Sequence, residues 1–422
     1  MLRLLRAAAP GLVLLCCASC SEPGRSPERI VLIVVDTLRR DHVSAYGGTP
    51  LTPRIDALAA RGQTFRNVRA AFHQTTMSMG SLFTGRTPSL ETQDPARTLS
   101  WNGETWCGMA RFAAVGSEGV CLPDTLPTLG DRMRQAGYWT IGIASNQFMF
   151  GGAGFSRGFD DWVEVGSQDS PISQPRQKRR WLSEQRSWTP VTKAAIAALA
   201  RRPRDRFFLF VHFMDVHDYH YLGIDYREAV GVLDAAVGTL LDGLEAEDLL
   251  EGATVVLTSD HGERLAETHQ PRGRPSHYGN PSFEEVLEIP LIVAPATDAD
   301  PAAPLRTPEL HHLLEGIAGL RPEREDVLES GEHYISERFF RTYISGNWKS
   351  ALRRRDDKLF LFDLAADPAE QRDVAADRPE IAEAHRSRID QLTRNLAIRT
   401  RRGDRELSEA ERRTLEALGY VE

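Results

Sequence analysis

Cysteine is scarce in this chain of 422 residues: there are five, and three of them lie within the first twenty positions. The other two are Cys107 and Cys121, and neither stands beside a basic or histidine-rich motif, so a cysteine nucleophile is not favoured. In an oxidising compartment the pair could close a short loop and stabilise it by about 3 kcal/mol. We therefore expect a disulfide between Cys107 and Cys121, with two buried free thiols as the alternative.

An excess of positive charge is also missing, because the formal net charge is −8 at pH 7. Binding to nucleic-acid phosphates requires a basic face, so general nucleic-acid binding is excluded. Short basic runs occur at 175–180 and 353–355, and we interpret both as solvated surface. Hydrophobic residues make up 41% of the chain, which is enough for a large buried core.

The apolar stretch at the N-terminus is too short to cross a membrane as a helix, which takes about 20 residues. Residues 1–20 combine two arginines, an apolar core and small residues, a pattern typical of a signal peptide. Their end, Ala18-Ser19-Cys20, resembles a bacterial lipobox and predicts a lipid on Cys20, while cleavage near Ser19 without a lipid is the alternative. Both interpretations predict export to a bacterial cell envelope, and the first predicts membrane contact only through the lipid on Cys20.

Strand and helix patterns alternate through the first three quarters of the chain. Apolar runs rich in β-branched and aromatic residues predict buried strands at 29–35, 206–214 and 253–259. Amphipathic patterns predict helices from about residue 52 to 62 and over 226–244. This alternation predicts an α/β fold, a three-layer α/β/α sandwich with a large mixed, mostly parallel sheet.

The pattern changes near residue 305. Three later segments read as antiparallel strands, and a helix is predicted from about Pro379. We therefore expect a main domain over 27–305 and a C-terminal subdomain over 306–422, built from a small antiparallel sheet and a helix.

Polar side chains follow three of the predicted strands at the point where each strand ends. Asp36 follows the first, Asp215 and His217 follow the second, and Asp260 and His261 follow the third. Ligands of open α/β sheets collect beyond the carboxyl ends of the strands, so these side chains mark a candidate site. Taken singly, each has a plainer interpretation, since an aspartate there is usually a turn or cap residue.

A short helix is expected between these strands, with Thr75 in its first turn. A helix N-terminus offers unpaired N–H groups and the positive end of a dipole, which suit a phosphoryl or sulfuryl group. Histidines also gather nearby, because six of the twelve fall within 212–277. The pattern therefore indicates a metal-assisted site for an anionic ester.

Several stretches together resemble the sulfatase-like branch of the alkaline phosphatase superfamily, from about Ile30 to the C-terminus. They are VVDTLRRDHVSAYG, TPRIDALAARGQTFRN, SLFTGRTP, QAGYWTIGIASN, GFSRGFD, FVHFMDVH, TSDHGE, GNPSFEEVLEIPLIV and LFDLAADPAEQRDVA. The resemblance implies one divalent metal ion at the end of the sheet, Ca²⁺, Mn²⁺ or Zn²⁺, with a nucleophile on the helix beside it.

Positions carry over one by one from this resemblance. It implies that Asp36, Asp260 and His261 bind the metal together with Thr75, which also falls on the position of the nucleophile. His217 falls where a family histidine contacts the ester or protonates the leaving group. The substrate-binding residues that we expect are His277, Asn146 and Asp215.

The departures from the family pattern bear on the chemistry. Sulfatases carry C-x-P-x-R or S-x-P-x-R, from which formylglycine is made, whereas this chain has Met77 at the proline position and Met79 at the arginine position. Thr37 replaces a second metal-binding aspartate, and Ser145-Asn146 replaces a sulfate-binding lysine and histidine. An unmodified threonine that has become bonded to sulfur or phosphorus is freed only when water attacks that atom. Relatives with threonine at this position cleave or transfer phospho-groups through such a phosphothreonine.

Three hypotheses follow. The first is an exported hydrolase or transferase acting on a phosphoester or phosphonate ester, for example on an envelope glycan or lipid, with Thr75 as the nucleophile. The second is a sulfuric ester hydrolase that works without formylglycine. The third is a non-catalytic envelope protein that keeps the fold to bind an anionic partner.

Overall fold

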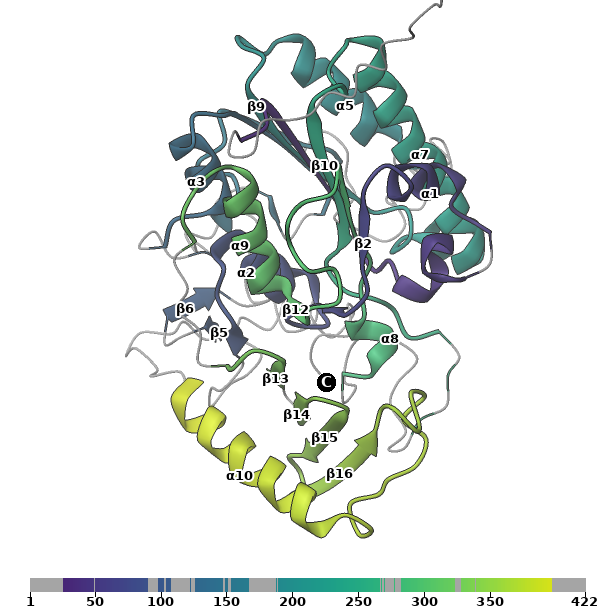
Figure 1. Cartoon of the computed structure of the whole chain (residues 1–422), viewed down its shortest axis with the longest axis vertical. Helices are drawn as coiled ribbons and strands as arrows, with labels where there is room; N and C mark the ends of the chain where they lie inside the picture. Colours follow the sequence, from purple (N-terminus) through teal and green to yellow (C-terminus); the bar gives the residue numbers. More distant parts are fainter. Residues whose placement is uncertain are drawn as a thin grey trace, which may run out of the picture.

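A large sheet covered by helices and a smaller sheet with one long helix make up the molecule (Figure 1). The computed structural model describes residues 26–48, 50–89, 98–101, 104–107, 122, 126–146, 149–150, 153–166, 187, 189–265, 267, 269, 277, 282–322, 328–337 and 339–396. None of the helices in these ranges is long and apolar enough to span a membrane.

The large sheet has seven strands and is mostly parallel, as predicted. Its strands, in spatial order, are β2 (Gln63–Phe65), β11 (Leu291–Ala294), β10 (Ala253–Ser259), β1 (Arg29–Val35), β9 (Phe207–Phe213), β7 (Trp139–Ala144) and β8 (Asp161–Glu164). Strand β1 pairs in parallel with β10 on one side and with β9 on the other. Strand β11 runs antiparallel to both of its neighbours, β10 and β2. The predicted strands at 29–35, 206–214 and 253–259 are therefore the central ones.

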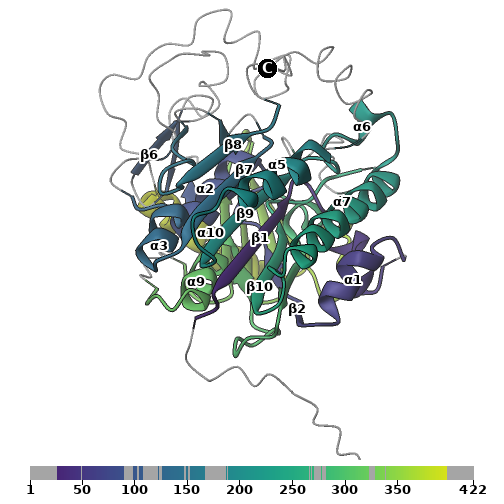
Figure 2. The ribbon, with the colours of Figure 1, turned by 90° about the horizontal axis from the view of Figure 1, so that it is seen from above.

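Alternate residues of the central strands face opposite helical layers. In β1, Ile30, Leu32 and Val34 belong to one apolar cluster, while Val31, Ile33 and Val35 belong to another. The first cluster lies under α2 (Thr75–Thr84), α3 (Leu129–Gln135) and α9 (Thr307–Ile317). The second lies under α1 (Pro53–Ala59), α5 (Thr189–Ala200) and α7 (Tyr226–Ala246). Figure 2 shows these two groups of helices, and the three-layer prediction is confirmed.

Short elements connect these layers. They are η1 (Arg40–His42), η2 (Ser44–Tyr46), β3 (Val68–Arg69), β4 (Pro88–Ser89), β5 (Thr98–Trp101), β6 (Glu104–Cys107), α6 (Tyr219–Leu222), α8 (Glu284–Leu287) and β12 (Leu305–Arg306). Strand β12 pairs in parallel with β3, and β4, β5 and β6 form a small antiparallel sheet.

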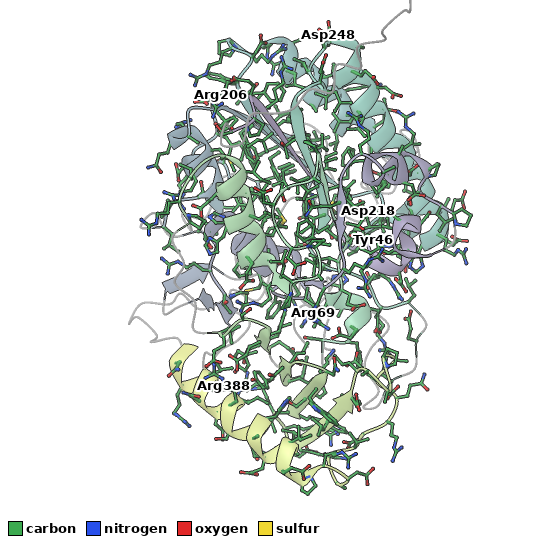
Figure 3. The ribbon with its side chains drawn as sticks, viewed as in Figure 1. Tyr46, Arg69, Arg206, Asp218, Asp248 and Arg388 are labelled. Carbon is green, nitrogen blue, oxygen red and sulfur yellow. The ribbon has the colours of Figure 1, made fainter. Side chains whose placement is uncertain are left out.

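The C-terminal part is the predicted antiparallel sheet and helix. Its strands, in order, are β13 (Glu332–Ser336), β14 (Phe340–Ser345), β15 (Trp348–Arg353) and β16 (Lys358–Asp363). Helix α10 (Pro379–Leu396) packs on this sheet, where Ile389 and Leu392 join an apolar cluster with Leu361. Arg388 of α10 also pairs with Glu332 of β13 (Figure 3). The boundary between the two predicted domains stays a prediction.

Candidate active site

The polar residues that follow the central strands come together at one edge of the sheet. The parallel register pairs Val35 with Ser259, so Asp36 and Asp260 follow neighbouring strand ends. The same register pairs Val35 with Phe213, which places Asp215 and His217 just beyond β9. The edge therefore collects the side chains that the sequence marked.

Asp36, Asp260 and His261 form a buried cluster whose potential metal-binding atoms all lie within 4.8 Å of one another. The Nε2 atom of His261 lies 3.5 Å from Asp260 Oδ2 and 3.8 Å from Asp36 Oδ1. The other ring nitrogen, Nδ1, lies 2.8 Å from the Gly262 carbonyl, which accepts its hydrogen and leaves a lone pair on Nε2. This is the orientation that metal-binding histidines adopt.

The electrostatics of this cluster fit a divalent cation. Asp36 Oδ1 and Asp260 Oδ2 are buried and have no hydrogen-bond partner among the described residues. Burial raises the pKa of Asp260 to about 6 and lowers the pKa of His261 to about 4. Buried carboxylates beside a neutral imidazole need a compensating positive charge, and a bound cation supplies it.

A second group of possible ligands, His311, His312 and Glu315, lies on α9. There, however, the Glu315 carboxylate already pairs with the Arg132 guanidinium, 2.5 Å from its Nε. Together with the two histidines, Arg132 lowers the pKa of Glu315 despite its burial. Because a fixed cation already occupies this carboxylate, the first cluster is the better metal site.

Thr75 is the first residue of α2, as expected, and its side chain is buried. Its Oγ1 lies 3.4 Å from Asp36 Oδ2 and 3.5 Å from His261 Nε2. Gln74, at the N-cap, makes no side-chain hydrogen bond to the helix. The hydroxyl therefore sits beside the candidate metal ligands, next to backbone N–H groups that can bind an anion.

Asn146 lies against the same two residues. Its Nδ2 donates to Asp36 Oδ2 at 2.8 Å and lies 3.5 Å from Thr75 Oγ1. The amide therefore orients the Asp36 carboxylate, and its predicted contact with substrate stays a prediction. Asp215 is fully buried at the end of β9, and its predicted role is likewise untested.

His217 and His277 lie side by side, and a carboxylate orients each ring. His217 Nδ1 lies 2.9 Å from an oxygen of Asp218, and His277 Nδ1 lies 2.9 Å from an oxygen of Glu263. The ring centroid of His277 is 5.9 Å from that of His217 and 4.8 Å from that of His261. Both rings are thus held near the candidate metal site. The position of Asp218 can be followed in Figure 3.

Two buried residues of this region, Glu263 and His73, were missed by the sequence reasoning, and a third, His212, was counted only among the clustered histidines. Glu263 orients His277, and His212 Nε2 lies 3.9 Å from Asp36 Oδ2. His73 stands two residues before Thr75 and is fully buried. The only sequence signal for His73 was its position beside the nucleophile helix.

Three residues of the remaining predictions cannot be placed. Cys20 and Cys121 lie outside the described residues, and of Cys107 only the backbone, at the end of β6, is described. The predicted disulfide and the predicted lipid therefore stay predictions.

The fold and the site are those expected of an α/β/α ester hydrolase, with a candidate metal site beside the N-terminus of a helix. Comparison with known families gives the same result, because the family model described as Sulfatase matches residues 28–312. The chain belongs to the sulfatase family. Membership classes it with hydrolases of sulfuric or phosphoric esters that depend on a metal ion.

Named relatives are distant. Human arylsulfatase A is 26% identical over 273 residues, a match that covers 56% of this chain and 52% of arylsulfatase A. The chain thus spans about half the length of that relative. An N-acetylgalactosamine-6-O-sulfatase of Bacteroides thetaiotaomicron is 22% identical, covering 83% of this chain and 90% of the relative.

A solved phosphonate monoester hydrolase of Agrobacterium radiobacter shares the fold. It superposes with a TM-score of 0.61 at 14% identity, covering 88% of this chain and 96% of the hydrolase. At this identity the likeness shows the fold alone.

Proposed function

We propose that the chain hydrolyses an anionic phosphoester or phosphonate ester, with unmodified Thr75 as the nucleophile. One observation carries the proposal: Thr75 Oγ1 lies 3.4 Å from Asp36 Oδ2 and 3.5 Å from His261 Nε2. A hydroxyl at that position can share a cation with both residues, which lowers its pKa and makes it a nucleophile at neutral pH.

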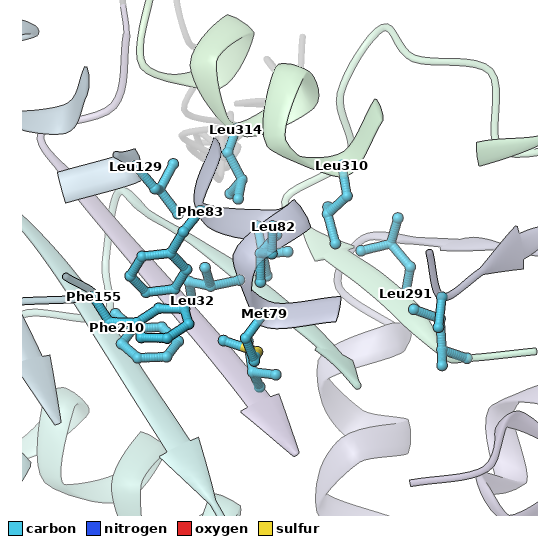
Figure 4. Packing of buried hydrophobic residues seen from close by; sticks show 14 of the residues in the cluster. Leu32, Met79, Leu82, Phe83, Leu129, Phe155, Phe210, Leu291, Leu310 and Leu314 are labelled. Carbon is cyan, nitrogen blue, oxygen red and sulfur yellow. The ribbon is translucent and has the colours of Figure 1, made fainter. Parts of the chain in front are cut away.

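The surroundings of Thr75 oppose the chemistry of an ordinary sulfatase. Met77 and Met79 occupy the proline and arginine positions of the formylglycine motif, and both side chains are fully buried. Both belong to the apolar cluster that packs α2 on the sheet, and Figure 4 shows Met79 in it with Leu32 and Leu82. An arginine at the position of Met79 would bury its charge in this apolar cluster, which is unfavourable.

In this proposal, each residue around the ester has a separate role. A divalent ion held by Asp36, Asp260 and His261 would supply Lewis-acid polarisation of the ester and charge neutralisation. Thr75 Oγ, having lost its proton to solvent, attacks the phosphorus, and the bond to the leaving oxygen breaks. His217, oriented by Asp218, gives that oxygen a proton. Water then gives a proton to the neutral His217 and attacks the phosphorus of the phosphothreonine. The bond to Thr75 Oγ breaks, which restores the deprotonated Thr75 and the protonated His217.

The donor set favours particular ions. Two carboxylates, one imidazole nitrogen and one hydroxyl are available at this cluster. All-oxygen sites suit Ca²⁺, whereas a site with an imidazole ligand is typical of Mn²⁺ or Zn²⁺. We propose one Mn²⁺ or Zn²⁺ ion, with Ca²⁺ as the alternative.

Sulfuric ester hydrolysis without formylglycine is the second candidate. Family membership and the two named sulfatase relatives favour it. A sulfate monoester is also a tetrahedral anion, so the same cluster could bind it. The reaction would need water to release sulfate from Thr75, a step that formylglycine avoids.

We also propose that the chain is exported and anchored by a lipid on Cys20, and that its ester lies on an envelope glycan or lipid. The leader at 1–20 supports export. The sulfatase relative named for N-acetylgalactosamine supports a glycan. Replacing Cys20 with alanine should move the protein from the membrane fraction to the soluble fraction if the lipid is present.

Turnover tests the proposed function. The mature protein, loaded with metal, would be offered an aryl phosphodiester, an aryl phosphonate monoester and an aryl sulfate. Turnover of a phospho-substrate that is lost in Thr75→Ala supports the proposal. Turnover of the sulfate alone would establish the second candidate instead.

A further inference from the structure

His73 is a buried histidine that the mechanism above does not use. It precedes α2 by two residues, its side chain is fully buried, and its ring stacks on Phe72 with centroids 4.6 Å apart. It is two residues from the candidate nucleophile, Thr75, which begins the helix whose N-terminus would bind an anion.

One ring nitrogen of His73 is paired and the other is not. Nδ1 lies 2.8 Å from the Ser282 hydroxyl oxygen, while Nε2 is buried with no partner among the described residues. Within the described part of the chain, His73 is the sole partner of that hydroxyl. If Nδ1 donated, the serine hydrogen would lack an acceptor, so we assign Ser282 as the donor to Nδ1 and place the ring hydrogen on Nε2. A buried N–H without an acceptor is unfavourable, and a bound ligand that accepts from it would remove that cost.

The His73 ring belongs to the environment of the active site. Thr75, two residues further on, has its Oγ1 3.5 Å from His261 Nε2, and the ring centroid of His261 lies 4.8 Å from that of His277. With its hydrogen on Nε2, the His73 ring offers a donor to an anion bound at the N-terminus of α2 beside these residues.

Ser282, the partner of His73, is held by the C-terminal sheet. Lys349 of β15 is fully buried, and its Nζ donates to the Ser282 carbonyl at 2.6 Å. The same ammonium pairs with Glu284 at 3.0 Å and with Glu370 at 2.7 Å. Figure 1 shows α8, which begins at Glu284, between the large and the small sheet.

Two residues of this network adopt strained backbones. Ser282 has φ +52° and Glu370 has φ +53°, values in the left-handed region that are unfavourable for residues other than glycine. Such strain persists only where the surroundings over-determine it, and the buried Lys349 contacts both residues. The position of Ser282, and through it the His73 ring, is therefore fixed by the C-terminal sheet.

We infer that His73 is a further substrate-binding residue, whose Nε2–H donates to a non-bridging oxygen of the bound ester, with Ser282 and Lys349 as positioning residues. The inference rests on the proposed function only in that the site binds a tetrahedral anion. It holds equally for a phosphoric and a sulfuric ester.

The test compares four variants of the metal-loaded mature protein. His73→Leu removes the donor, His73→Gln keeps an N–H near the position of Nε2, and Ser282→Ala frees the ring. The matched control is His385→Leu, because His385 is a buried histidine of α10 whose Nδ1 lies 3.0 Å from the Ser350 hydroxyl, in the C-terminal part.

The two readouts are kcat/KM on whichever ester turns over and the affinity for orthophosphate and sulfate by calorimetry. We expect kcat/KM to fall by about 100-fold in His73→Leu, as for loss of one oxyanion donor, and by about 10-fold in Ser282→Ala. His73→Gln should regain most of the loss, and His385→Leu should stay within about threefold of the wild type.

Several results would overturn the inference. His73→Leu within about threefold of the wild type in kcat/KM and in anion affinity would exclude contact with the ester. If His73→Leu fails to fold, an unchanged Ser282→Ala counts against the inference in the same way. If the wild type turns over none of the esters, the proposed function fails, and weaker orthophosphate or sulfate binding by His73→Leu still supports the inference. A wild type that binds neither anion would overturn both.

Discussion

The hydroxyl of Thr75 lies 3.4 Å from Oδ2 of Asp36, although 39 positions separate the two residues in the chain. Asp36 directly follows the central strand of the sheet, and Thr75 begins a helix on the adjacent layer. The contact brings the candidate nucleophile to the candidate metal ligand. The roles proposed for both residues depend on this arrangement.

Replacing the nucleophile should abolish turnover with little effect on folding. We expect Thr75→Ala to reduce kcat by at least about 10³-fold, because no other hydroxyl would form the covalent intermediate. Thr75→Ser keeps the hydroxyl and should retain measurable turnover. Thr76→Ala, a change at the next buried position of the same helix, is the control and should stay near the wild type. Steady-state kinetics with a phosphodiester measures all three.

Metal binding should depend on Asp260 and not on Glu315. Asp260→Asn removes one of the two negative charges of the cluster at nearly constant size, so we expect bound metal to fall well below one ion per chain. Glu315→Gln should leave the metal content unchanged, since that carboxylate pairs with Arg132. Elemental analysis of dialysed protein measures both, and equal metal loss in the two variants would contradict the assignment.

The arginine of the formylglycine motif should not fit this core. Met79 is fully buried in an apolar cluster, so Met79→Arg would bury a charge there without a designed partner. We expect a loss of about 3–5 kcal/mol in the free energy of unfolding. Met79→Leu, which conserves volume, should cost less than about 1.5 kcal/mol. Denaturant titration compares them, and an arginine variant as stable as the leucine variant would show that the site tolerates the family motif.

The buried ammonium of Lys349 should stabilise the contact between the two parts of the molecule. Arg69 and Lys349 together lower the pKa of Glu284 to about 2, although burial alone would raise it. Lys349→Met leaves Glu284 and Glu370 without this partner, and we expect a loss of about 3–5 kcal/mol. Lys358→Met at the half-exposed start of β16 is the control and should cost less than about 1 kcal/mol. The denaturation midpoints report the difference.

Stability should fall on acidification partly through His333. Burial lowers the pKa of this histidine to about 3, and its Nε2 hydrogen is donated to the Ala70 carbonyl at 2.7 Å. Below about pH 6.5 the unfolded chain takes up a proton that the folded chain refuses, so stability is lost as pH falls toward 3.

His333→Gln keeps a donor and cannot titrate. Between pH 7 and 5 the wild type should lose about 2 kcal/mol more than this variant in the free energy of unfolding. Parallel denaturation curves at the two pH values measure the difference. Identical losses in wild type and variant would show that His333 does not titrate as the fold implies.

The sequence predicted the parts of the fold that periodicity and composition determine. The strand at 29–35 has the predicted bounds, because an unbroken β-branched run that stops at an aspartate strongly favours a buried strand. The strand at 253–259 also has its predicted bounds. The helix expected to carry Thr75 in its first turn begins at that residue. The register between the two strands then brought Asp36 and Asp260 together, which follows from the parallel pairing.

Contacts between distant segments could not be predicted. Nothing in the sequence pairs His73 with Ser282, since the contact depends on the path of the chain into α8 and on Lys349 from the C-terminal sheet. Similarly, the hydrogen bond from Asn146 to Asp36 depends on where β7 ends relative to β1. A resemblance to a family pointed to Asn146 by position, but not to the partner of its amide.

The most direct test of the central claim is to look for the phosphothreonine itself. The metal-loaded protein would be quenched in acid during turnover of a phosphodiester, digested and analysed by mass spectrometry. The account predicts a phospho-adduct on Thr75 in the wild type and none on that peptide in Thr75→Ala. Turnover with no adduct on Thr75, or with an adduct on another residue, would contradict it.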